Sequence, residues 1–201
     1  MSDSSGGSSR PNIVFIQTDS QDGRILGCMG HPAMGRATPN IDRLARRGVM
    51  FPQAYTNNPI CCPSRASMWS GQWTHHCEGW NNFKGLEPDT PTFRDRLDAG
   101  GYLTQTFGKL DFLSGAHTDR ARVSAWLRSA NIPRPTYWDH APVIQEDRDE
   151  ERSKDWKTVN KCVEWLRANA GGEQPLWMYL GLNLPHPGFT TNRRYAEMID
   201  E

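Results

Sequence analysis

The sequence carries no excess of charge of either sign. It has 23 Lys plus Arg and 23 Asp plus Glu among 201 residues, which gives a formal net charge of zero. A protein without a positive field has little long-range attraction for nucleic acid or an anionic membrane. We therefore expect neither as a partner, while a local basic pocket for a small anion stays compatible with this balance.

Long apolar runs are also missing. The longest are 13–16 and 176–182, whereas a membrane-spanning helix needs about 20 apolar residues. Residues 1–10 are rich in Ser and Gly and lack the apolar segment of a signal peptide, so the chain as it stands is expected to be cytoplasmic. A longer native N-terminus would make it lysosomal or exported instead. Five cysteines are an odd and small number, which does not suit a disulfide scaffold.

What the chain does have is an alternation of strand-like and helix-like segments after an expected flexible tail at 1–10. Apolar runs predict strands at 13–16, 49–55, 102–107 and 176–182. Amphipathic spacing and capping residues predict helices at 41–48, 63–71, 92–99, 120–129 and 155–170. The first and last strands are expected to be buried on both faces. This alternation predicts an α/β fold with a mostly parallel sheet flanked by helices, and proline-broken residues 131–153 are expected to form an exposed insertion.

Polar residues stand where three of the predicted strands end. Asp19 follows the first strand, Lys109 the third and His186 the last. Taken singly, each has an ordinary explanation as a cap, a turn residue or a surface-loop residue. Because ligands of open α/β sheets bind beyond the carboxyl ends of the strands, the three together predict one pocket. A carboxylate, an ammonium and an imidazole suit a metal ion plus an oxyanion substrate.

The segment 58–71 is the most informative part of the chain. Its adjacent Cys61 and Cys62 could be buried structural thiols, which is the usual fate of free cysteine. Zinc is a second explanation, with further ligands from residues 75–77, but zinc sites favour Cys-x-x-Cys or longer spacings. A nucleophilic thiolate is a third, since a helix that begins at Pro63 would lower the pKa of a nearby thiol.

A fourth interpretation rests on a longer motif. Its residues are Cys61, Pro63, Ser64, Arg65 and Gly71. This pattern resembles the signature of the sulfatase family, within the alkaline-phosphatase-like superfamily. The resemblance implies that a formylglycine-generating enzyme oxidises Cys61 rather than Cys62, because Pro must follow two places later and Arg four. In the family the hydrated aldehyde attacks sulfur, and its second hydroxyl then releases sulfate, which divides one hard hydrolysis into two easier steps.

The local physical chemistry agrees with this resemblance. Pro63 at a helix start leaves the N–H groups of that turn free, so these groups and the helix dipole are expected to favour an anion there. Arg65 falls in the first helical turn, where its guanidinium can reach back to the same group.

Segments on both sides of the motif extend the resemblance. Residues 11–19 resemble the opening strand of the family, which ends in a calcium ligand, so Asp19 is the implied metal ligand. Lys109 matches the family lysine that contacts the sulfate group, and His186 matches the histidine that contacts the sulfate ester. Asp111 stands where many members have histidine, and one arylsulfatase subgroup shares this trait.

The resemblance therefore implies a complete set of roles. The implied catalytic residues are Cys61, Arg65, Lys109 and His186, of which Lys109 and His186 also bind substrate. The implied ligands of a divalent cation, Ca2+, are Asp19 and Cys61. The implied substrate is a small sulfate ester or a sulfated saccharide, such as a sulfated uronate of a glycosaminoglycan.

The chain is short for this family. Catalytic domains of the family are longer, and a second metal-ligand segment and a second sulfate-binding lysine lie further downstream in them. After His186 only Asn192 and Asp200 are candidates, and neither has the right context. We therefore interpret 11–201 as the N-terminal portion of a sulfatase catalytic domain, poorly active or inactive alone.

Two further functions stay open on the sequence. One is a phosphonate or phosphodiester hydrolase of the same superfamily, which shares the metal and oxyanion machinery. The other is a non-catalytic remnant that binds sulfated glycans by stacking sugar rings on Trp73, Trp80 and Phe83. Candidate contacts to a sugar carboxylate are Asn81, Asn82 and Lys84.

Overall fold

A three-stranded parallel sheet forms the centre of the molecule. The computed structural model describes residues 10–82, 84–113, 143–144, 153–186 and 188–199. The strand order is β1-β4-β2, with both neighbours parallel to β4. The three strands are β1 (Ile13–Gln17), β4 (Leu176–Gly181) and β2 (Leu103–Gly108). The α/β fold with a parallel sheet predicted from the sequence is confirmed.

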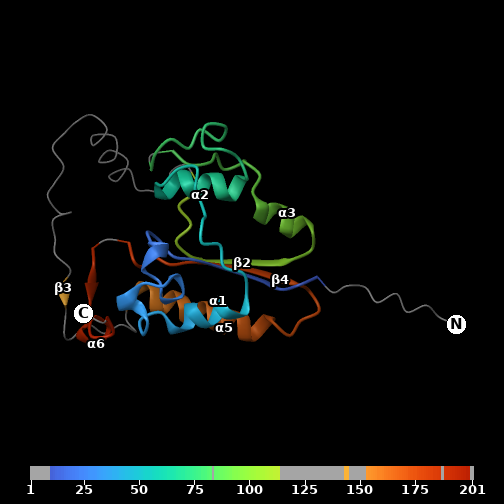
Figure 1. Cartoon of the computed structure of the whole chain (residues 1–201). Coiled ribbons are helices and arrows are strands. Elements are labelled where there is room, and N and C mark those ends of the chain that lie inside the picture. The colour runs from blue at the N-terminus through green and yellow to red at the C-terminus, as the bar shows by residue number, and fades with distance from the viewer. Residues whose placement is uncertain (1–9, 83, 114–142, 145–152, 187, 200–201) are drawn as a thin grey trace.

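Helices cover both faces of this sheet (Figure 1). The helices α2 (Cys61–Ser70) and α3 (Phe93–Ala99) lie on one side, and α1 (Pro39–Arg47) and α5 (Lys154–Asn169) on the other. Short 3-10 turns connect β1 to α1: η1 (Gly23–Ile25), η2 (Gly27–Met29) and η3 (Pro32–Met34). A second parallel pair joins β3 (Val143–Ile144) to β5 (Thr190–Thr191), and α6 (Arg193–Ala196) follows. Within the described residues no helix is long and apolar enough to cross a membrane.

The predicted strands had mixed outcomes. Every residue of β4 is buried because a strand and a helical layer cover it on each side, and β2 also forms as expected. The expectation that 13–16 is buried on both faces is wrong, since Val14 and Ile16 are 47% and 59% exposed. Among the described strands β1 pairs with β4 alone, so it is an edge. The strand predicted at 49–55 is also wrong, because this apolar run has no neighbouring strand to pair with among the described residues.

The predicted helices fared better. Those expected at 41–48, 92–99 and 155–170 form as α1, α3 and α5 within two residues of the predicted ends. The helix expected at 63–71 begins two residues earlier, at Cys61. The helix predicted at 120–129 and most of the insertion predicted at 131–153 lie outside the described residues. Within the tail predicted at 1–10 the described residue is Arg10, whose guanidinium lies 5.5 Å from the Tyr102 ring.

An aromatic cluster fastens α2 to the sheet. Trp69, on the inner side of α2, is fully buried, and its ring stacks on Phe112 at 4.2 Å and Phe93 at 4.8 Å between centroids. Its edge contacts are Trp177 and Tyr179 of β4. Because alternate residues of a strand face opposite sides, Leu176, Met178 and Leu180 pack on α5 instead. The orientation of α2, and so of its first residue Cys61, depends on this cluster.

We predict that Trp69→Ala lowers the free energy of unfolding by about 3–5 kcal/mol, because it opens a cavity between four aromatic rings. The matched control is Trp73→Ala, since Trp73 is 60% exposed, and its effect should stay within about 0.5 kcal/mol. Urea unfolding followed by circular dichroism measures both. Equal losses in the two variants would contradict the packing described for α2.

Candidate active site

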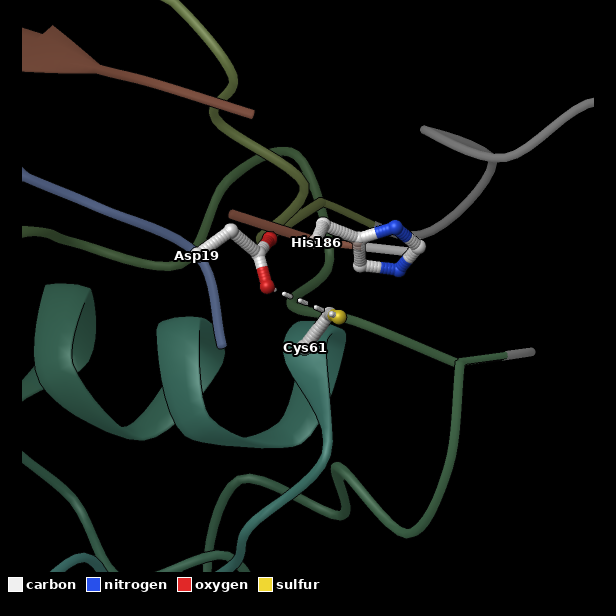
Figure 2. Close-up of side chains that lie close together, drawn as sticks. All are labelled: Asp19, Cys61 and His186. Carbon is white, nitrogen blue, oxygen red and sulfur yellow. Dashed lines mark hydrogen bonds between the residues drawn. The ribbon is translucent and has the colours of Figure 1, made fainter. Parts of the chain in front are cut away.

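Four elements deliver the predicted polar residues to one place. Asp19 follows β1, Lys109 directly follows β2, His186 follows β4, and Cys61 is the first residue of α2. Figure 2 shows the side chains of Asp19, Cys61 and His186 close together, with the Asp19 carboxylate directed at the Cys61 side chain. Their ligand atoms all lie within 4.8 Å of each other. The residues at the carboxyl ends of the parallel strands thus come together in one place, as the sequence predicts.

Two glycines let the strand ends come this close. A Cβ at Gly108 would lie 2.0 Å from the carbonyl oxygen of Gly181, and a Cβ at Gly181 would lie 2.0 Å from that of Lys109. Gly108 also has a positive φ of 78°, which L side chains rarely adopt. Any side chain at either position would push β2 and β4 apart at the point where Lys109 enters the site.

Asp19 is the ionic centre of the site. Its buried carboxylate lies 2.5 Å from Lys109 Nζ and 3.3 Å from Arg65 Nη2, both measured from Oδ2. Burial acts to raise the pKa of Asp19, but the hydrogen bond and charge of Lys109 outweigh it, so the pKa is lowered. Burial acts in the opposite direction on Lys109, and the contact with Asp19 again prevails, so the pKa of Lys109 is raised. Both groups are therefore charged at neutral pH.

Arg65 is held from several directions beneath this pair. Its Nη1 donates to the Tyr179 hydroxyl at 2.7 Å and to the backbone oxygen of Lys109 at 3.0 Å. The Tyr179 hydroxyl in turn donates to Gln17 Oε1 at 2.5 Å. A guanidinium fixed in this way is a rigid positive charge. It reaches Asp19 directly and affects Cys61 through its charge.

Cys61 lies beside the ion pair as a thiol. Its Sγ is 3.8 Å from Asp19 Oδ1 and 3.8 Å from Lys109 Nζ. Burial raises the pKa of the Cys61 thiol, and the Lys109 ammonium offsets this only in part. The lowered thiol pKa expected from a helix beginning at Pro63 is therefore wrong. A protonated thiol does not favour the thiolate-nucleophile interpretation.

The start of α2 is capped by two asparagines. The backbone N–H of Ile60 donates to Asn58 Oδ1 at 3.0 Å, and that of Cys62 donates to Asn82 Oδ1 at 2.9 Å. The expectation that N–H groups of this turn stay free for an anion is wrong for these donors. The side-chain oxygen of Asn82 thus caps α2, and the contact of Asn82 with a sugar stays a prediction. Positive charge at the site comes from Arg65 and Lys109.

A cavity of about 380 Å³ adjoins these groups. Its polar lining includes Asp19, Cys61, Arg65 and the hydroxyl residues Thr56 and Ser64. This volume is in the range of small-molecule sites. The cavity therefore gives a small ester access to Cys61.

The residues present do not form a calcium shell. The one metal-compatible cluster of His, Cys, Asp and Glu among the described residues is Asp19, Cys61 and His186, and it offers one oxygen, one sulfur and one nitrogen. Calcium takes about six to eight oxygen ligands. A calcium ion at this place would need most of its ligands from beyond the described residues. The zinc set considered on the sequence does not gather either, since residues 75–77 are not part of this cluster.

Sequence reasoning missed several residues that shape the site. Tyr179 lies within an apolar run, where its hydroxyl gave no separate signal, yet it contacts Arg65 and Gln17.

Of the aromatic residues considered for sugar stacking, Trp73 and Trp80 are exposed, and Phe83 lies outside the described residues. Whether they bind a glycan stays a prediction.

Comparisons with known proteins agree on one family. The family model described as Sulfatase matches residues 11–200. Arylsulfatase K of Gallus gallus is 45% identical over 183 residues, which are 90% of this chain and 34% of that protein. Arylsulfatase K of Homo sapiens is 44% identical over 182 residues, which are 88% of this chain and 33% of that protein. The chain thus spans about a third of the length of these relatives.

Solved structures share the fold. The phosphonate monoester hydrolase of Agrobacterium radiobacter superposes with a TM-score of 0.71 at 20% identity, covering 94% of this chain and 44% of that one. A 2-O GAG sulfatase superposes with a TM-score of 0.60 at 25% identity, covering 88% of this chain and 35% of that one. The sulfatase-like sheet flanked by helices, predicted from the sequence, is confirmed by these likenesses.

We predict that Asp19→Asn lowers the free energy of unfolding at pH 7 by about 3–5 kcal/mol, because it leaves the buried Arg65 guanidinium without its carboxylate and Lys109 with Asp111 alone, at 3.5 Å. Since the pKa of Asp19 is lowered in the folded state, its contribution is complete above the ordinary Asp pKa of about 3.9 and fades as the pH falls through the folded pKa. The gap between wild type and variant should therefore close in acid. Urea titrations at several pH values measure it.

The control for this variant is Asp22→Asn, which breaks an exposed ion pair with Arg24. Its cost should be much smaller than that of Asp19→Asn, because solvent screens an exposed ion pair. A cost for Asp19→Asn no greater than this would contradict the buried ion pair.

We also predict that Cys61 alkylates with an apparent pKa above that of free cysteine, because burial disfavours its thiolate. Lys109→Met should raise this pKa further, since the Lys109 ammonium lowers it, and Asp19→Asn should lower it. Iodoacetamide labelling at a series of pH values, quantified on the peptide that contains residue 61, measures the midpoint. A midpoint below that of free cysteine would mean that Cys61 is an activated thiolate, and it would contradict the description of Cys61 as a protonated thiol.

Proposed function

The chain belongs to the sulfatase family, and on that premise we propose that it supplies the nucleophile and the anion-binding groups for hydrolysis of a sulfate ester. The observation that carries this proposal is the position of Cys61. It is the first residue of α2, it borders the cavity, and its Sγ lies 3.8 Å from the ammonium of Lys109. A residue in this position can attack an anionic ester that the cations of Lys109 and Arg65 bind.

The proposed nucleophile is formylglycine, made from Cys61 by a formylglycine-generating enzyme. When formed and hydrated, this group would supply one oxygen to attack sulfur and a second hydroxyl that, on losing its proton, would restore the aldehyde and expel sulfate. The raised pKa of the unmodified thiol supports this choice over direct attack by sulfur. Cys61 is also accessible from the cavity, whereas its neighbour Cys62 is buried.

The other site residues bind and orient in this proposal. Lys109 carries three N–H donors: one contacts Asp19, one points at Cys61 Sγ, and Asp111 lies 3.5 Å away. The donor that points at residue 61 can contact the oxygens of a sulfate ester held there. Arg65 adds a second positive charge behind Asp19. His186 lies close enough to Cys61 to pass a proton to the leaving alcohol as a general acid.

We propose Asp19 and residue 61 as two ligands of a divalent cation, Ca2+. Asp19 is a carboxylate held charged, which suits a hard cation. The remaining oxygen ligands would come from residues outside the described set. No step is assigned to the cation on the residues present.

The proposed substrate is a sulfated saccharide, such as a sulfated uronate of a glycosaminoglycan. Support comes from a structural relative that is a 2-O GAG sulfatase. A phosphonate or phosphodiester ester is the second candidate, and a non-catalytic glycan-binding remnant the third. Because the chain spans about a third of its relatives, we expect slow turnover from these residues alone.

The test is co-expression of the chain with a formylglycine-generating enzyme, followed by peptide mass spectrometry and assays with 4-nitrophenyl sulfate and a 4-nitrophenyl phosphonate. We expect an aldehyde at residue 61 and turnover below about 1 s⁻¹, the lower end for typical enzymes, with the sulfate preferred. Cys61→Ala should abolish both aldehyde and turnover, while Cys62→Ala, the adjacent control, should retain both.

Each other outcome has a meaning. An unmodified thiol at residue 61 together with glycan binding would replace the proposal with the non-catalytic function. Preference for the phosphonate would favour the second candidate. Turnover at the rate of an ordinary enzyme would show that these residues need no further ligands.

A further inference from the structure

A buried carboxylate that has no part in the proposed reaction binds the turn that carries His186. Asp155 lies in the first turn of α5 and is 8% exposed. Its Oδ1 accepts from the side-chain Nδ2 of Asn183 at 2.8 Å, and its Oδ2 accepts from the backbone N–H of Leu184 at 2.8 Å. The backbone N–H of Asn183 is shared between both oxygens, at 3.0 and 2.9 Å. One carboxylate therefore binds every donor at the start of this turn.

The same turn connects to two site residues. The backbone oxygen of Asn183 accepts from the N–H of His186 at 2.9 Å, which closes the turn. The backbone oxygen of Leu184 accepts from the N–H of Asp19 at 3.1 Å. Asp155 thus binds the N–H groups of Asn183 and Leu184, while the carbonyl groups of the same two residues bind the backbone of His186 and of Asp19.

Helix capping does not account for this carboxylate. The N-cap of α5 is Ser153, whose hydroxyl accepts from the N–H of Trp156 at 3.3 Å. Asp155 instead extends away from its own helix to donors some 28 residues further along the chain. Hydrogen bonds to a charged acceptor are stronger than neutral ones, and buried N–H groups that lose a partner are costly.

We propose that Asp155 is a positioning residue that places His186 against Cys61 and Asp19. The role of His186 in ester cleavage rests on the proposed function, but the placement itself does not. Asp155→Asn keeps the size of the side chain while its NH2 group would face a backbone N–H. The turn would lose at least one acceptor and His186 would shift from Cys61.

The matched control is Asp42→Asn. Asp42 is likewise buried in the first turn of a helix, and its Oδ1 accepts from the N–H of Cys28 at 2.8 Å and from the Thr38 hydroxyl at 3.0 Å. Its contacts lie in the η2–α1 region, with Gly27, Cys28 and Thr38, and not in the turn at 183–186. A general loss of stability would affect both variants, whereas displacement of His186 would follow from Asp155→Asn alone.

The experiment is NMR on the isotopically labelled full chain. In the wild type we expect downfield, exchange-protected amide protons at Asn183 and Leu184 and nuclear Overhauser contacts between the His186 ring and the Cys61 β-protons. In Asp155→Asn these contacts should be lost and the His186 ring shifts moved, while Asp42→Asn keeps both. If Asp155→Asn fails to fold, the wild-type amide signals still decide, because solvent-exchanging amides at both positions would overturn the proposal.

A second readout ties the placement to function. Titration with sodium sulfate, followed on the His186 ring, should show affinity weakened about tenfold by Asp155→Asn, the scale expected when one hydrogen bond to a charged ligand is lost, and unchanged by Asp42→Asn. Wild-type protein that binds no sulfate would count against the proposed function and leave the placement of His186 to the Overhauser data. Unchanged His186 contacts in Asp155→Asn would overturn the role of Asp155 whatever the sulfate result.

Discussion

The ion pairs of Asp19 with Lys109 and Arg65 are the constraint on which the rest of the site depends. They join the end of β1, the end of β2 and the first turns of α2, three segments that are distant in sequence. Each of these charges would be costly to bury alone, and removing one partner strands the others. Correct pairing of the strands and neutralisation of the charges are therefore one event, and the cluster resists any shift of one element relative to another.

Close packing fixes the position of α2 more precisely than the ion pairs can. Charge attraction tolerates small displacements, but the rings around Trp69 do not, because close-packed side chains have few alternative arrangements. Tyr179 belongs to both systems: its ring contacts Trp69 and its hydroxyl bonds Arg65. The aromatic core and the polar site are therefore joined through a single side chain of the central strand, which fixes Cys61 and Arg65 together with α2.

The sequence predicted what local patterns encode. Strand alternation and the rule that ligands bind at the carboxyl ends of strands brought Asp19, Lys109 and His186 together correctly. Contacts between distant segments were not predictable: Asp155, Asn82 and Tyr179 have ordinary local contexts, and their roles arise only when the chain folds. The strand predicted at 49–55 failed because apolar content cannot reveal whether a partner strand exists. The thiol pKa of Cys61 failed because burial, which is a tertiary property, outweighs the helix dipole.

The two carboxylate oxygens of Asp19 have different partners in the site. Oδ2 faces the cations of Lys109 and Arg65, while Oδ1 accepts from the Ser20 hydroxyl at 3.1 Å and lies 3.8 Å from the Cys61 sulfur. Ser20 achieves this with a positive φ of 60°, a costly conformation for a residue with a side chain. Strain is thus accepted next to the carboxylate that orients residue 61. The strain at Ser20, the buried charges and the close contact between Gly108 and Gly181 thus lie together at the carboxyl ends of the strands, although they are distant in sequence. They hold residue 61 between fixed charges, which is the arrangement that the proposed hydrolysis of an anionic ester would use.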